Sequence, residues 1–155
     1  DGRGVPSATM VQGEMQTCFR MTADAFRAEM ERRETFHTLL SSYLQTLLRF
    51  IMQSTACNAV HSQEQRLARW ILTAHDHMGR REFPLTQEFV AMMLGTSRPT
   101  VTVAAGTLQK AGLITYRQGR VTVTDREQLE AASCECYGVT SQLLRTLQDE
   151  RAKSR

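Results

Sequence analysis

The stretch from residue 94 to residue 114, LGTSRPTVTVAAGTLQKAGLI, restricts the possible folds more than any other part of the chain. Gly95 permits a sharp turn, Ser97 is a favourable helix N-cap, and Pro99 falls in the first helical turn, where a missing amide hydrogen costs little. The pattern predicts a helix over about residues 98–110 with three apolar side chains on its inner face: Val101, Ala105 and Leu108.

Helix signals also precede this turn. Ser62 and Gln65 form a capping box at the start of an apolar stripe, and Gly79 supplies a left-handed stop. Residues 80–84 are then expected to form a loop. Thr86 caps a second helix, whose inward side chains are predicted to be Phe89, Val90, Met93 and Leu94. We also expect Met92 and Met93 to lie in the core. Two helices joined by a short turn containing glycine predict a helix-turn-helix.

A β-hairpin is predicted directly after the third helix. Residues 113–116 and 120–124 are β-branched runs with period-two alternation, and the sequence Arg117-Gln118-Gly119 between them favours a tight turn. Such a hairpin is the wing of a winged helix-turn-helix.

A long helical pattern occupies residues 35–60 and contains neither proline nor glycine. Its apolar surface is about two stripes wide, so one stripe could cover its own domain while the other meets a second copy of the chain. The alternative is a buried core helix. The residues predicted to form the dimer contact are Phe36, Leu40, Tyr43, Leu44, Leu47 and Ile51.

The two ends of the chain carry weaker patterns. Residues 1–21 indicate turn and strand, and Thr22 could cap a short helix to about Met30. Asp125 with Gln128 predicts a helix from about residue 126 to 137, and three leucines indicate a last helix before a charged tail: Leu143, Leu144 and Leu147. The fold class is therefore α+β and mostly helical.

The net charge of +3 is unevenly distributed. Residues 62–125 hold eight basic and five acidic residues, which leaves an excess of three, whereas the segments before and after them are each neutral. No acid occurs between Phe89 and Thr124, a run that holds four basic residues: Arg98, Lys110, Arg117 and Arg120. This asymmetry favours an anionic partner for the middle of the chain, such as a nucleic acid.

Composition and motifs exclude several classes of function. No apolar run approaches the length of a membrane span, and no signal peptide is recognisable at the start. Four cysteines are too few for a secreted disulfide scaffold, so we expect a cytoplasmic protein. The sequence lacks nucleophile–base, Walker and dinucleotide-binding motifs. We therefore expect neither an enzyme nor a cofactor.

The paired cysteines and histidines do not predict a metal site. On one helix, the side chains of Cys134 and Cys136 would point about 200° apart, so they could not both bind one ion. We expect them to be small buried residues, with redox or metal chemistry as the alternative. His75 and His77 have the same unsuitable spacing, and His61 is isolated.

The order of these elements resembles the C-terminal half of the Crp/Fnr family of bacterial transcription regulators. The motifs that carry the resemblance are QRLARWIL (65–72), LTQEFVAMMLG (85–95), TSRPTV (96–101), LQKAGLI (108–114) and the wing. The resemblance implies the tail of a sensory β-roll in residues 1–34, a dimerisation helix in 35–61, a winged helix-turn-helix in 62–137 and a helical tail in 138–155. It implies a sequence-specific regulator that binds an inverted-repeat operator on double-stranded DNA as a homodimer, with RNA polymerase as a further partner.

The resemblance also implies roles for individual residues. Ser97 and Thr100 would contact phosphates and Arg98 a base edge, with Thr86 and Gln87 against the DNA backbone. Further contacts are expected from Thr102 and Val103 on the recognition helix and from Arg117 and Arg120 on the wing.

Two departures from the family pattern alter these expectations. Pro99 and Val103 stand where many relatives carry Glu and a second Arg, so the usual half-sites do not transfer. Ile51 and Met52 stand where the cyclic-AMP receptor uses hydroxyl groups, which argues against that effector. The rival reading is a winged-helix module that binds proteins.

Overall fold

The computed structural model describes residues 19–153. They fold into helices and one small sheet, which confirms the predicted α+β class. The predicted β-roll tail falls mostly on residues 1–18, outside the described residues. The short helix predicted after Thr22 is confirmed, and the Thr22 hydroxyl caps it by accepting the Ala25 amide. In chain order the elements are α1 (Ala23–Arg32), α2 (Thr35–Val60), α3 (Gln63–Met78), β1 (Glu82–Pro84), α4 (Gln87–Leu94), α5 (Arg98–Lys110), β2 (Ile114–Arg117), β3 (Arg120–Val123), α6 (Arg126–Ala131) and α7 (Cys136–Lys153).

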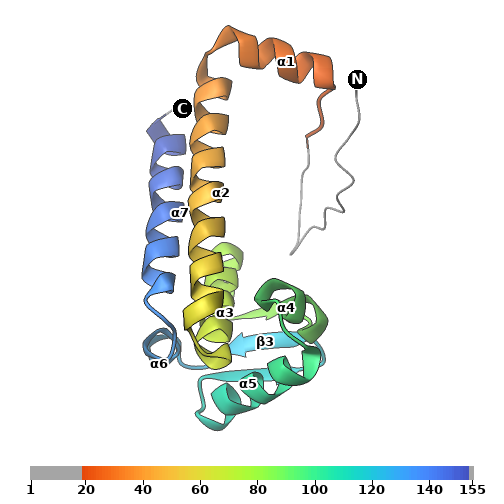
Figure 1. The fold of residues 1–155 in the computed structure, drawn as a ribbon, viewed down its shortest axis with the longest axis vertical. Helices are drawn as coiled ribbons and strands as arrows, with labels where there is room; N and C mark the ends of the chain where they lie inside the picture. Colours follow the sequence, from red (N-terminus) through yellow and green to blue (C-terminus); the bar gives the residue numbers. More distant parts are fainter. Residues whose placement is uncertain (1–18, 154–155) are drawn as a thin grey trace.

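The long helix α2 forms the axis of the molecule, and α7 packs along it (Figure 1). The sheet, α4 and α5 lie together near the C-terminal end of α2, whereas α1 lies at its other end (Figure 1). Because the C-terminal helix covers part of α2, only some of its apolar surface remains open.

The chain between residues 126 and 137 is not the single helix that the sequence predicts. α6 ends at Ala131 and α7 begins at Cys136. Ser133 explains part of the break, because its hydroxyl donates to the Glu130 carbonyl at 2.8 Å and so competes with the helical backbone. The turn reverses the chain and sends α7 back along α2.

The sheet is antiparallel in the order β1-β3-β2. Its hairpin is the predicted wing, but the turn has only two residues, Gln118 and Gly119, with φ of 49° and 72°. This left-handed pair matches the twist of the flanking strands. Arg117 and Arg120 therefore face each other across the hairpin.

The expected loop at residues 80–84 contains the edge strand β1, so that prediction was wrong. Phe83 is buried while its neighbours are exposed, and it pairs with Val121 of β3. Three residues are too few for a clear alternation in the sequence, and Pro84 suits an edge strand because its missing donor faces away from the ladder.

The core of the helix-turn-helix follows the prediction in part. Val101, Ala105 and Leu108 are buried, as are Val90 and Leu94. Met92 is 61% exposed, so the prediction that it lies in the core was wrong. Phe89 and Met93 are only partly buried. Ala91 takes the buried position that the adjacent methionine was expected to fill.

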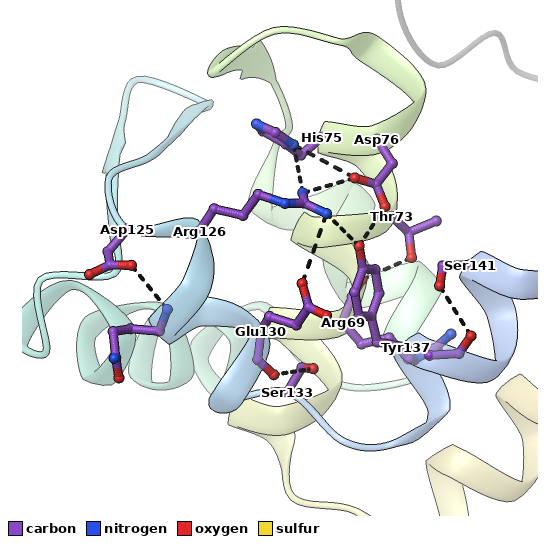
Figure 2. Close-up of polar contacts among 12 residues, drawn as sticks. Arg69, Thr73, His75, Asp76, Asp125, Arg126, Glu130, Ser133, Tyr137 and Ser141 are labelled. Atoms are coloured by element: carbon purple, nitrogen blue, oxygen red, sulfur yellow. Dashed lines mark hydrogen bonds and ion pairs between the residues drawn. The ribbon is translucent and has the colours of Figure 1, made fainter.

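A polar network joins α6 and α7 to α3 (Figure 2). The Arg126 guanidinium lies 2.8 Å from a carboxylate oxygen of Asp76 and donates to the Tyr137 hydroxyl at 2.7 Å. Tyr137 in turn donates to the other oxygen of Asp76 at 2.7 Å. Burial, followed by the hydrogen bond to Asp76, raises the pKa of Tyr137 to about 12.

Within residues 19–153, we find no helix that combines the length and the apolarity needed to cross a membrane.

Tyr137→Phe should lower the free energy of unfolding by about 1–3 kcal/mol at neutral pH, because it removes two hydrogen bonds to charged groups, from Arg126 and to Asp76. The raised pKa means that the fold favours the protonated phenol. Its contribution should be complete below the ordinary pKa of 10 and disappear as the pH rises through about 12. Urea unfolding at neutral and alkaline pH measures this, with Tyr43→Phe, at an exposed position, as the control. Equal stability of Tyr137→Phe and wild type at neutral pH would contradict the network's role.

Candidate nucleic-acid interface

Three local signals fix the geometry of the helix-turn-helix. The Thr86 hydroxyl accepts the Phe89 amide at 3.3 Å and so begins α4, and Gly95 ends that helix in the left-handed region with φ of 59°. Ser97 then caps α5 by accepting the Thr100 amide at 3.4 Å. Pro99 lies in the first turn of α5, as the sequence predicts.

The exposed face of α5 carries the residues expected to meet DNA. Arg98 and Thr102 are exposed, and Val103 is 68% exposed. The Thr102 hydroxyl donates to Gln87 at 2.8 Å, which joins the start of α4 to the second turn of α5. The start of α4 and the first two turns of α5 therefore share one surface.

The hydroxyl groups of Ser97 and Thr100 are hydrogen-bonded to each other. Their oxygens are 2.8 Å apart at the N-terminus of α5. Free amide groups and the positive end of the helix dipole at this position favour an anion such as phosphate. Each hydroxyl would have to turn outward to add a hydrogen bond of its own.

Two acids outside the acid-free run lie against its arginines. Glu88 forms an ion pair with Arg98 at 3.0 Å, and Glu82 forms one with Arg120 across the sheet. An acid-free run of sequence therefore does not produce an acid-free surface. Such exposed pairs contribute only about 0–1 kcal/mol, so a phosphate could compete for either arginine.

The wing tip lies beside the start of α4. The Leu85 amide donates to the Gly119 carbonyl at 2.7 Å, and the Tyr116 hydroxyl donates to the Leu85 carbonyl. Burial, followed by the negative charge of Glu88, raises the pKa of Tyr116 to about 12. The hairpin tip at Gly119, between exposed Arg117 and Arg120, therefore lies close to Thr86, and the predicted contact residues lie on neighbouring elements.

The residues predicted for dimerisation fall into two groups on α2. Phe36 and Leu40 are half-buried, and the Phe36 ring packs edge-on against Phe26 of α1 at 5.7 Å. The other four residues, Tyr43, Leu44, Leu47 and Ile51, are exposed. Two further exposed apolar residues that were not in the predicted dimer contact, Leu48 and Met52, lie beside them on the helix.

A cavity of about 600 Å³ lies next to this face. Tyr43 and Leu47 of α2, Trp70 of α3 and Leu144 of α7 contribute to its apolar lining.

The cysteine prediction was half correct. Cys134 and Cys136 are buried, as expected for small apolar residues. They do not share a helix, however, because Cys134 lies in the turn before α7. The argument that one helix would point them apart therefore fails, and Cys57 and His61 of the α2 C-terminal end lie beside them. Sequence reasoning missed this group, although Cys57 and His61 have the i, i+4 spacing of helical ligand pairs.

His75 and His77 serve structure in the described residues. His75 Nδ1 contacts the Arg126 guanidinium at 2.9 Å, and His77 Nδ1 contacts the Thr73 carbonyl at 2.7 Å. Both rings therefore have polar partners at the C-terminal end of α3, the helix end at which the sequence places them.

Solved structures share this fold at low sequence identity. A protein assigned to the crp/fnr family of transcriptional regulators from Eubacterium rectale is 23% identical with a TM-score of 0.57, over 71% of this chain and 51% of that one. A CooA variant from Carboxydothermus hydrogenoformans is 22% identical with a TM-score of 0.61, over 70% and 53% of the two chains. A CRP-family transcriptional regulator from Thermus thermophilus is 21% identical with a TM-score of 0.53, over 73% and 55%.

The present chain spans about half the length of these solved relatives. No curated protein is a significant match to it. The model of the Crp-like helix-turn-helix domain matches residues 65–132, which run from α3 through the wing to the end of α6. The chain therefore carries a helix-turn-helix domain of the Crp-like family.

Proposed function

We propose that the chain is a DNA-binding transcription regulator that binds an inverted-repeat operator as a homodimer. The observation that carries this proposal is the exposed first turn of α5, with Arg98 as its first residue and the wing tip beside α4, within a Crp-like helix-turn-helix domain. In this motif the second helix enters the major groove and its N-terminal residues contact base edges.

The side chains on this surface suit different parts of the duplex. Arg98 can form a bidentate contact with guanine N7 and O6, and Val103 offers a methyl surface suited to thymine. Ser97, Thr100, Thr86 and Gln87 would contact the backbone, as would Arg117 and Arg120 of the wing. Thr102 can make only weak contacts, so we expect one strongly read G·C pair in each half-site.

The open face of α2 supports the homodimer. Leu44, Leu48 and Ile51 are each more than half exposed and lie at helical spacing on one face. Burying such a face against its copy removes apolar surface from water, as in a two-stranded coiled coil. Two copies related by a two-fold axis would present their α5 helices to half-sites about 34–36 Å apart.

This role has consequences for location, partners and chemistry. A bacterial regulator works where the DNA is, so we place the chain in the cytoplasm, with RNA polymerase as a partner of the bound dimer. No enzymatic activity is proposed. The rival role, a winged helix that binds a protein, would leave affinity nearly independent of salt, whereas phosphate contacts release counterions and make it fall steeply.

Arg98→Ala should weaken operator binding by about 1–3 kcal/mol and relax discrimination at a single base pair. The operator is first obtained by selection from random DNA, and affinity is then measured on all variants of each half-site position. Lys110→Ala, at the other end of α5, is the control and should leave base preference unchanged. Equal weakening on random DNA would make Arg98 a phosphate contact instead.

Arg117→Gln and Arg120→Gln should weaken binding to operator and random DNA by similar factors and reduce the salt slope by about one unit each. Arg117 should have the larger effect on affinity, because Arg120 already forms an ion pair with Glu82. Fluorescence anisotropy over a series of salt concentrations measures both quantities. A loss confined to one base pair would indicate that the wing reads sequence.

The double variant Leu44→Glu, Ile51→Glu should be monomeric in sedimentation and lose tight operator binding, because paired carboxylates would be buried in the dimer contact. Both positions are 52% exposed in the single chain, so the fold of each chain should survive. Thr38→Glu, Ala56→Glu adds two acids at exposed positions of the same helix outside the apolar stripe, and it should remain dimeric. A dimeric Leu44→Glu, Ile51→Glu variant would place the contact elsewhere.

A further inference from the structure

Four side chains with metal-binding atoms converge where α2 ends and α7 begins. Cys57 lies in the last turn of α2 and His61 is its C-cap, whereas Cys134 and Cys136 flank the start of α7. The three sulfurs and the nearest imidazole nitrogen all lie within 4.8 Å of one another. The break between α6 and α7 makes this possible.

Two of the separations are close to the edge lengths of a tetrahedron around one ion, and the others are within 4.8 Å. Cys57 Sγ lies 3.5 Å from Cys134 Sγ, and Cys136 Sγ lies 3.7 Å from His61 Nδ1. With metal–sulfur bonds of about 2.3 Å and metal–nitrogen bonds of about 2.0–2.1 Å, tetrahedral geometry separates two sulfurs by about 3.8 Å and a sulfur from a nitrogen by about 3.6 Å.

The imidazole of His61 has the orientation expected of a metal ligand. Its Nε2 lies 3.1 Å from a carboxylate oxygen of Glu135, so Nε2–H can donate to Glu135 and leave the Nδ1 lone pair directed at the sulfurs. Histidine ligands commonly use their second nitrogen in this way. Gln53 adds a similar support, because its amide donates to Cys136 Sγ at 3.0 Å.

Burial and charge also favour an ion here. Cys57, Cys134 and Cys136 are at most 3% exposed. Arg69 is fully buried, and within the described part of the chain its guanidinium nitrogens have no hydrogen-bond partner. The guanidinium lies 5.5 Å from the centre of the Trp70 ring, but no anion among the described residues pairs with it, and a buried cation without a counter-charge is costly. The positive charge of Arg69 acts on Cys57, and three thiolates around a divalent ion carry one net negative charge, which would balance it.

We propose that Cys57, His61, Cys134 and Cys136 bind one divalent ion of the zinc class. A soft donor set of three sulfurs and one nitrogen in tetrahedral arrangement is typical of zinc. Four protein ligands leave no open position, so the site is structural and has no catalytic role. An iron–sulfur cluster with several iron atoms would need ligand atoms that are farther apart than these four. A Cys57–Cys134 disulfide would use two of the sulfurs but give no role to the His61–Glu135 pair.

The ion would join the α2–α3 junction to the turn before α7. Its binding energy would add to the stability of the folded state, because the unfolded chain has no preformed site. If the chain also acts as proposed above, the same ion would fix the DNA-binding domain against the dimerisation helix. That second step rests on the proposed function, whereas the site itself does not.

Metal content and spectra of the full chain test the site without any DNA. Protein purified under reducing conditions should contain one zinc per chain by mass spectrometry. After the metal is removed, Co²⁺ should give the intense visible bands of a tetrahedral ion and a thiolate-to-cobalt charge-transfer band. Wild type and Cys18→Ser, which keeps all four ligands, should behave alike.

Ligand variants separate the four positions. Cys57→Ser and His61→Ala should lose the tetrahedral cobalt spectrum, and chelators should no longer lower their melting temperature. Glu135→Gln keeps all four ligands and should weaken zinc binding by about 10–100-fold in competition with a chromophoric chelator. This variant is expected to fold, because Glu135 is exposed.

Two results would overturn the metal site. One is a reduced wild-type chain that is folded, holds no zinc and gives no tetrahedral cobalt spectrum. The other is a cobalt spectrum that Cys57→Ser or His61→Ala leaves unchanged. A Cys57–Cys134 disulfide found by peptide mapping in a chain that binds no metal after reduction would favour a redox pair in its place.

Discussion

The buried face of α3 is the constraint on which the rest of the described structure depends. Leu67, Ile71 and Leu72 are fully buried, and α4, α5, α6, α7 and the sheet all contact this helix. Burying such side chains contributes about 1.5–3 kcal/mol each, so the face sets where the surrounding elements can pack. The recognition helix has a fixed position because Val101, Ala105 and Leu108 fill the opposite side of the same core.

The packing around α3 also determines where α6 and α7 lie relative to α2. α6 returns to α3 through the Arg126 network, and the turn after it sends α7 along α2. The C-terminal helix therefore belongs to the packing of both α2 and α3. A change at the α2–α3 junction would reach α7 directly, since Cys57 and His61 lie against the residues that begin α7.

Charge on the proposed DNA surface is moderated by neighbouring acids. Glu88 and Glu82 compensate Arg98 and Arg120, so the free surface is less basic than the sequence run suggests. These exposed pairs are weak, and they hold the arginines near the surface at little cost. In the proposed function, such ion pairs would weaken non-specific attraction to DNA. They would still leave Arg98 able to contact a base once the duplex is bound closely.

The sequence by itself determined the elements whose signals are local. Ser62 with Gln65, Thr86, Gly95, Ser97 and the hairpin glycine act within a few residues of their own positions, so caps, turns and the α+β class could be predicted from them. The candidate DNA surface was predictable to the same extent, because its residues lie on two short consecutive helices and a hairpin.

Tertiary structure alone decided the contacts between distant residues. β1 needed a partner strand 38 positions away, and Cys57 met Cys134 across 77 positions. Periodicity over residues 126–137 also favoured one helix, and only side-chain competition at Ser133 and the packing of α7 on α2 divided it. Spacing along a chain constrains what one helix can present, but it says little about what two chain segments bring together, because long-range packing sets that distance.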